Sequence, residues 1–256
     1  MRKLMYIIVL LSVLLSGCFN IIEEEDTDEY RALASQYESF ITSDIVEVDQ
    51  FEAFVNEATF NSMMSNVMIK VSIYTRLHNL VGTRYGSGVI FATGAYNYVL
   101  TTFDLTDVSS EYIVTYQIAD YQGRTSNAYK DVVSEEYGLA VLRFVRILSN
   151  HLPGIGFADQ EPIMGEPILL FGYIGEVMNS MSMGLMDRTS VEDEISDKYM
   201  KTTIPSDVFA NGAAIVNTSN ELIGIQIGVE NGLSYAVSTT DILEFLEIYG
   251  NYHQLE

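Results

Sequence analysis

The sequence predicts an all-β fold, either a barrel or a sandwich, on three observations. From about Val67 onwards, short apolar or alternating segments recur with Gly, Asn and Asp between them, which is the pattern of short strands joined by turns. Strand-like and helix-like segments do not alternate, which disfavours a doubly wound α/β fold. The chain has 256 residues, of which 48% are hydrophobic and 19% charged, so it can build a sizeable core.

Ten segments carry this pattern and are expected to form strands. They are Val67–Tyr74, Gly88–Phe91, Tyr98–Thr102, Tyr112–Ile118, Leu139–Phe144, Pro167–Tyr173, Met181–Met186, Ala213–Asn217, Glu221–Ile227 and Leu233–Val237. A helix is expected after the last strand, because the capping sequence Ser238–Asp241 precedes the apolar run Ile242–Leu246 and Gly250 provides a stop.

Residues 1–17 are predicted to be a signal peptide. Arg2 and Lys3 precede an apolar segment, Met5–Leu15, that is short for a membrane-spanning helix. The following Leu-Ser-Gly-Cys, ending at Cys18, resembles the bacterial lipobox. That resemblance implies that the Cys18 thiol carries a lipid such as palmitate and anchors the chain to the bacterial cell membrane, facing the extracytoplasmic side. An ordinary secretory signal is the alternative, but Cys18 is the only Cys of the chain.

Two segments are expected between the signal and the main domain. Residues 18–30 are rich in Asp and Glu and are predicted to form an extended acidic tether. Residues 31–64 place apolar side chains at intervals of three and four, which predicts one or two short helices leading into a domain over residues 65–250.

The charge balance excludes some partners. The net charge is −22, with 35 acidic residues against 13 Lys and Arg, so there is no cationic surplus to neutralise nucleic-acid phosphates. Electrostatic adsorption to anionic lipid is disfavoured for the same reason. Neither a metal nor a cofactor is expected, because the sequence has no His-x-x-x-His, no Cys pair and no phosphate-binding glycine loop.

Several segments, in order, resemble bacterial trypsin-like serine proteases of the HtrA type. Gly86-Ser87-Gly88 opens an entry strand, Tyr98-Val99-Leu100-Thr101 leads toward the catalytic His position, Leu139-Ala140-Val141-Leu142 follows the Asp position, and Asn211-Gly212 lies in the nucleophile loop. Gly165–Gly172 and Ser234–Val237 match two flanking strands. The resemblance covers roughly residues 65–249 and implies a double six-stranded Greek-key β-barrel with a cleft between the barrels.

The resemblance assigns the triad positions to residues that cannot perform the triad chemistry. Asp104 stands in the place of the His, Gly138 in that of the Asp, and Asn211 in that of the Ser. An amide is no nucleophile at neutral pH, Asp titrates too low to be a good base for a hydroxyl, and Gly has no side chain to orient a base. Phe209 replaces the Gly that lets the oxyanion turn form.

The sequence therefore predicts a pseudoprotease that binds peptide or protein rather than cutting it. The family pairs substrate with the strand after the nucleophile loop, and such pairing needs no catalytic residue. In this chain the strand comprises Leu222, Ile223, Gly224, Ile225, Gln226, Ile227 and Gly228. Two alternatives remain open: an active serine-type endopeptidase with a noncanonical site, and a purely structural envelope lipoprotein.

Overall fold

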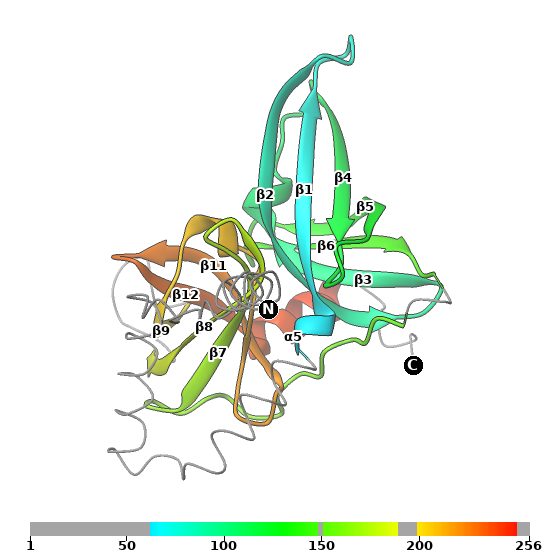
Figure 1. Ribbon diagram of the computed structural model, residues 1–256. Helices are drawn as coiled ribbons and strands as arrows, with labels where there is room; N and C mark the ends of the chain where they lie inside the picture. Colours follow the sequence, from blue (N-terminus) through cyan, green and yellow to red (C-terminus); the bar gives the residue numbers. More distant parts are fainter. Residues whose placement is uncertain (1–61, 148–150, 189–198, 250–256) are drawn as a thin grey trace, which may run out of the picture. The chain divides into compact units, whose positions relative to one another are not determined.

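The computed structural model describes residues 62–147, 151–188 and 199–249, all of which belong to one compact unit of the chain, Ser43–Glu256. Its twelve strands form two closed antiparallel barrels of six strands each (Figure 1). The all-β prediction and the double barrel implied by the resemblance are both confirmed.

The first barrel contains strands β1 to β6 in the order β1-β2-β3-β6-β5-β4. Their bounds are Asn66–Tyr74, Leu80–Thr93, Tyr96–Thr102, Ile113–Ala119, Thr125–Ser134 and Leu139–Val145. The one-turn helix α4, Phe103–Thr106, follows β3 and carries one of the predicted site positions.

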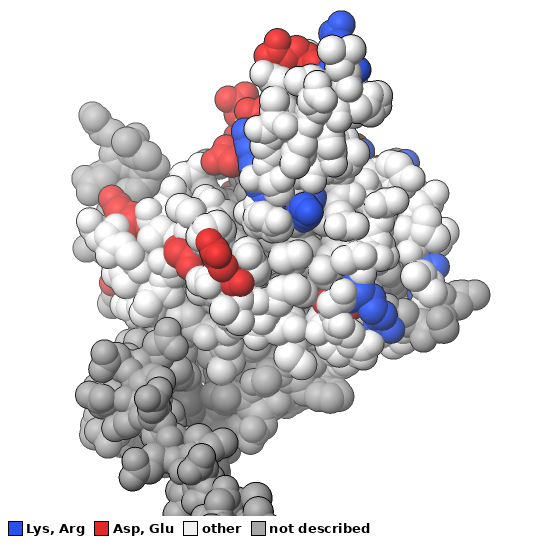
Figure 2. All heavy atoms as spheres, turned by 45° about the horizontal axis from the view of Figure 1, so that its top comes forward, with Lys and Arg blue, Asp and Glu red and all other residues white. Residues whose placement is uncertain are grey.

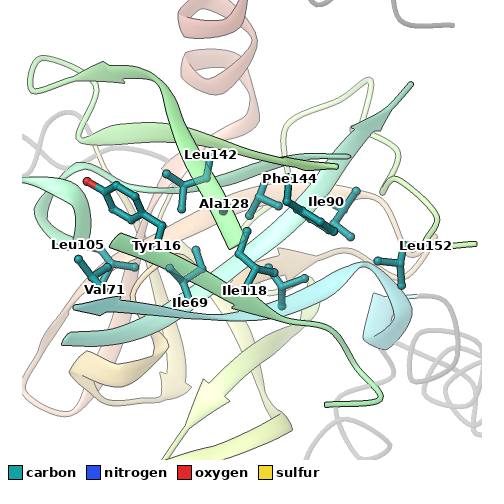
Figure 3. Packing of buried hydrophobic residues seen from close by; sticks show 12 residues of the cluster. Ile69, Val71, Ile90, Leu105, Tyr116, Ile118, Ala128, Leu142, Phe144 and Leu152 are labelled. Atoms are coloured by element: carbon teal, nitrogen blue, oxygen red, sulfur yellow. The ribbon is translucent and has the colours of Figure 1, made fainter. Parts of the chain in front are cut away.

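Alternating side chains fill the first barrel. Ile69 of β1, Ile90 of β2, Ile118 of β4, and Leu142 and Phe144 of β6 are buried and point toward one another (Figure 3). Because successive side chains of a strand face opposite sides, every second residue of these strands enters the core.

The second barrel contains strands β7 to β12 in the order β10-β11-β12-β9-β8-β7. Their bounds are Pro167–Ile174, Val177–Arg188, Met200–Pro205, Ala214–Val216, Leu222–Glu230 and Leu233–Ser238. A short 3₁₀ helix, η1, covers Val208–Ala210 and precedes β10. Ile168, Leu170, Ile204, Ile215 and Ile223 are fully buried in the core of this barrel.

Two strands were not among those predicted from the sequence. Strand β5 buries only two of its ten residues and has a bulge near Lys130, so its sequence lacks the regular apolar alternation of a half-buried strand. Strand β9 does alternate, but it is short, with six residues, and contains only Met200 and Ile204 as large apolar residues. Strand β5 is held between β4 and β6, and strand β9 between β8 and β12, so pairing with both neighbours makes up for the weak local signal.

The predicted C-terminal helix is α5, Thr239–Tyr249. The Ser238 hydroxyl accepts a hydrogen bond from the Asp241 N–H at 3.3 Å and donates one to the Asp241 carboxylate at 3.1 Å. These bonds satisfy a backbone donor at the start of the helix, as the sequence predicts. Gly250, the predicted stop, lies outside the described residues.

Helix α5 also packs on the first barrel. The Tyr137 ring, between β5 and β6, lies 5.9 Å from the Phe245 ring and 6.2 Å from the Tyr249 ring. Burial, followed by a hydrogen bond to Glu244, raises the pKa of Tyr137 to about 12. Since this phenol stays neutral through the physiological range, the contact between the helix and the first barrel remains uncharged on the tyrosine side.

The structure describes only the last few residues of the predicted N-terminal segments. Residues 62–65 are helical and lead directly into β1. The signal peptide at 1–17, Cys18, the tether at 18–30 and the rest of the 31–64 lead-in lie outside the described residues. Within the described ranges, no helix is long and apolar enough to cross a membrane.

Candidate functional site

The structure brings the three matched triad positions together around the middle of β2. The Phe103 N–H donates to the Gly138 carbonyl at 2.9 Å, so the start of helix α4, with Asp104 as its second residue, lies beside Gly138. A Cβ atom added at Gly86 would lie 2.8 Å from Leu105 and 3.1 Å from the Asn211 carbonyl oxygen. Residues from α4, from the β5–β6 turn and from the loop after η1 therefore converge on one place.

Each of these positions has a local environment of its own. The Asp104 side chain is exposed, and its backbone carbonyl accepts a hydrogen bond from the Arg84 guanidinium at 2.9 Å. Gly138 has a φ of +66°, and the end of the Ile227 side chain lies 4.0 Å from the place where its Cβ would be. The Asn211 amide oxygen has a long contact of 3.4 Å with the Gln226 side-chain amide.

Asp207 fixes the conformation of the loop that corresponds to the nucleophile loop. One of its carboxylate oxygens accepts from the N–H groups of Phe209 and Ala210 at 2.8 and 3.3 Å, and the other accepts from the Gly175 N–H at 2.6 Å. The Asn211 N–H donates to the Val208 carbonyl at 3.3 Å. In a serine protease the oxyanion hole consists of the N–H of the Ser and that of the residue two before it. Here the equivalent N–H groups, on Asn211 and Phe209, are both engaged inside the loop.

Gln226 is an organising residue whose role the sequence analysis missed. Its side chain is fully buried, donates to the Asp207 carbonyl at 2.9 Å and accepts from the Ser206 hydroxyl at 2.7 Å. Its backbone N–H and carbonyl bond to Ala213 and Gly212 at 3.0 and 2.8 Å. One signal pointed to it: Gln226 is the only polar side chain between Leu222 and Val229, and a buried amide must find partners.

Ser87 joins the loop to the first barrel. Its N–H donates to the Asn211 carbonyl at 2.8 Å, and its hydroxyl accepts from the Tyr173 N–H of β7 at 2.8 Å. Its carbonyl accepts from the Thr101 hydroxyl at 2.7 Å. Ser87 is fully buried, so these bonds stabilise a contact between strands of both barrels in the absence of solvent competition.

Only part of the predicted peptide-binding strand has open backbone. Residues Leu222–Ile225 of β11 pair with β10 on one side, and Gly224 and Ile225 also pair with β12 on the other. The backbone of Gln226 is also hydrogen-bonded on the side of β11 that faces β10. Residues 227–230 are not paired with any described strand on that side. Gly228 lies under Tyr235, whose hydroxyl would be 2.1 Å from a Cβ added there.

An aromatic cluster lies beside the loop and comprises Tyr85, Tyr173 and Phe209. Their rings come from β2, β7 and η1, and the Tyr173 centroid is 6.1 Å from each of the other two. The neighbouring Val208 side chain is 65% exposed, which extends the apolar surface. Burial, and then the nearby Glu176, raises the pKa of Tyr173, so its phenol stays neutral. The sequence did not reveal this cluster, because its members are far apart in the chain.

The described residues contain no group of three or more His, Cys, Asp or Glu side chains arranged to hold a metal ion. On the face drawn in Figure 2, the Lys and Arg side chains are scattered and do not form one basic patch. The absence of a cofactor and of a nucleic-acid partner stays a prediction.

A comparison with protein families gives one match. A family model for the trypsin-like peptidase domain matches residues 86–225, which is more than half of the chain. The matched range runs from β2 into β11 and includes Asp104, Gly138 and Asn211. A search of the curated proteins found no match.

The contact between Ser87 and the loop at Asn211 predicts a strict requirement for glycine at position 212. Gly212 has a φ of +91°, and a Cβ added there would lie 2.0 Å from the Ser87 carbonyl oxygen. We expect Gly212→Ala to lower the free energy of unfolding by about 3 kcal/mol or more, measured by urea denaturation.

Gly156→Ala is the matched control. Gly156 lacks a positive φ, and no atom lies within 4 Å of the added Cβ. Its effect should stay within about 1 kcal/mol. Equal effects of the two substitutions on the free energy of unfolding would contradict the view that the close contact between Ser87 and Gly212 stabilises the fold.

Proposed function

This chain belongs to the trypsin-like peptidase family, and we propose that it is a membrane-anchored, extracytoplasmic pseudoprotease that binds peptide or protein segments where its two barrels meet. The observation that carries the proposal is the hydrogen bonding of the nucleophile-type loop. The Phe209 N–H donates to Asp207 and the Asn211 N–H donates to Val208. Neither donor is directed toward a place where an oxyanion would develop.

The side chains support loss of catalysis independently of the loop. Acyl transfer needs a nucleophile, a base within hydrogen-bond reach and a group that orients the base. The residues that converge here are Asn211, Asp104 and Gly138, and none of them supplies its role. Ser206, the nearest serine before the loop, donates its hydroxyl proton to the Gln226 side chain and has no base as its partner.

Binding is supported by the surface that remains. The aromatic cluster and the exposed Val208 offer apolar contact area beside the loop. The open backbone of residues 227–230 adds donors and acceptors for an extended segment, although Tyr235 lies over Gly228. A ligand that pairs with this backbone and packs an apolar side chain on the cluster would use both features.

The first test concerns catalysis. We expect Asn211→Ser to give no hydrolysis of casein and no labelling by a fluorophosphonate probe above the level of Asn211→Ala. The reason is that a restored hydroxyl would still lack a base, an orienting carboxylate and oxyanion donors. Labelling of the unaltered chain that disappears on mutation of one Ser would instead establish an active, noncanonical hydrolase.

The second test concerns binding. Peptides selected from a displayed random library on the unaltered chain should bind Phe209→Ala about tenfold or more weakly, because aromatic anchors dominate such interfaces. Fluorescence polarisation measures the affinity. Tyr129→Ala is the control, since Tyr129 is 59% exposed and lies outside the aromatic cluster. Equal affinity for both variants, or no selected peptide at all, would contradict the proposed site.

The third test concerns the anchor, which rests on the lipobox-like sequence alone. In bacteria expressing the chain, we expect a palmitate analogue to label the unaltered protein and the protein to fractionate with the membrane. Cys18→Ala should remove both the label and the membrane association, since no other thiol exists in the chain. Membrane association that persists without label would point to an uncleaved signal segment instead.

A further inference from the structure

The chain contains two Asn-Gly pairs, Asn211-Gly212 and Asn231-Gly232, and the structure gives them opposite environments. In such a pair the glycine nitrogen can attack the side-chain amide carbon of the asparagine, because the glycine has no Cβ that stands in the way. The attack forms a cyclic imide and releases ammonia. Whether a given pair reacts depends on what holds the glycine N–H and on the room around it.

Gly232 lies exposed in a tight turn. It forms the turn between β11 and β12 together with Asn231, and the two residues have φ values of +82° and +54° (Figure 1). Two positive values are typical of the type I′ turn that Asn-Gly forms in hairpins. Both residues are exposed, and no described residue accepts a hydrogen bond from the Gly232 N–H. This nitrogen can therefore lose its proton to solvent without breaking a hydrogen bond of the protein.

The hairpin tip also leaves room for the reaction. A Cβ added at Gly232 would meet no atom within 4 Å. The Ser206 N–H bonds to the Gly232 carbonyl at 3.0 Å, which holds that carbonyl and not the reacting nitrogen. Asn231 has a positive φ, which costs free energy in a residue other than glycine, so turning out of this conformation releases strain.

Gly212 is held in the opposite state. It is buried, and its N–H donates to the Gln226 carbonyl at 2.8 Å. A Cβ added at Gly212 would lie 2.0 Å from the Ser87 carbonyl oxygen, so the backbone has no room to move. Attack by this nitrogen would break a buried hydrogen bond, which is more costly than breaking one in water. Asn211 is therefore protected, although it has the same neighbour in the sequence.

We propose that Asn231 is a site of spontaneous deamidation and isoaspartate formation in the folded protein, and that Asn211 is not. The Gly232 nitrogen gives its proton to solvent and forms a bond to Cγ of Asn231. The Cγ–Nδ2 bond breaks, and Nδ2 takes up a proton and leaves as ammonia. Water then opens the imide at either carbonyl and gives aspartate or isoaspartate. Water is the only other reactant.

Either product changes the tip of the hairpin. A carboxylate at position 231 adds a negative charge beside Glu230, whose own carboxylate pairs with Lys201 at 3.1 Å. Isoaspartate also inserts a methylene into the backbone of a turn whose geometry sets the pairing of its strands. The hydrogen bond from the Ser206 N–H to the Gly232 carbonyl should weaken as a result.

Peptide mapping of the aged protein tests the site. The full chain is incubated in mildly alkaline buffer with detergent and is then digested with pepsin at low pH, where the imide forms slowly. Mass spectrometry locates the converted asparagines, and an isoaspartyl methyltransferase detects isoaspartate. We expect Asn231 to convert at least about tenfold faster than Asn211, because only Gly212 must give up a buried hydrogen bond. In concentrated urea, which exposes both pairs, the two rates should be similar.

Asn231→Gln is the matched variant, because glutamine keeps the amide but closes a larger ring far more slowly. It should remove most of the acidic form that accumulates on isoelectric focusing. Asn127→Gln is the control, since Asn127 is also exposed but precedes Ala128 instead of a glycine. It should leave the acidic form unchanged. Equal rates at Asn211 and Asn231 in the folded protein, conversion of Asn231 only after unfolding, or an acidic form that Asn231→Gln does not diminish would overturn the proposal.

Discussion

The hydrogen bond from the Ser87 N–H to the Asn211 carbonyl, 2.8 Å long, is the contact on which the arrangement of the site depends. It joins a strand of the first barrel to the loop that enters the second. These two segments can approach each other because Gly212 adopts a φ of +91° and has no side chain, which leaves room for the Ser87 carbonyl. Asp104, Gly138 and Asn211 meet because the two barrels are held at this point and under helix α5.

Side-chain hydrogen bonds of Asp207 and Gln226 hold the loop between β9 and β10 in place. The Asp207 carboxylate accepts three backbone hydrogen bonds, and the Asp207 carbonyl accepts one from the Gln226 side chain. Charge-assisted bonds of this kind are stronger than neutral ones and define a single loop conformation. The bond to Asp207 occupies the Phe209 N–H, and a separate bond to the Val208 carbonyl occupies the Asn211 N–H, the two groups that an oxyanion would need. In the proposed function, order in this loop serves recognition, because a rigid loop loses little entropy when a ligand binds.

Local patterns in the sequence were sufficient to predict most strands and the all-β class, because half-buried strands leave an alternating signal. Strand β5 left none, since only two of its ten residues are buried and a bulge near Lys130 breaks the alternation. The double barrel and the meeting of positions 104, 138 and 211 were predicted only through a resemblance that spans several segments. The roles of Asp207 and Gln226 escaped prediction because they rest on side-chain hydrogen bonds to residues 19 and 32 positions away.

Gly138 bears on how far this chain stands from a working triad. Its φ of +66° is a conformation that most side chains adopt only with strain, and Ile227 lies 4.0 Å from the place where a Cβ would be. A carboxylate introduced there would start from a left-handed backbone and lie against an apolar neighbour. If the chain is the pseudoprotease proposed above, restoring a triad would require a change of backbone conformation at this position as well as new side chains.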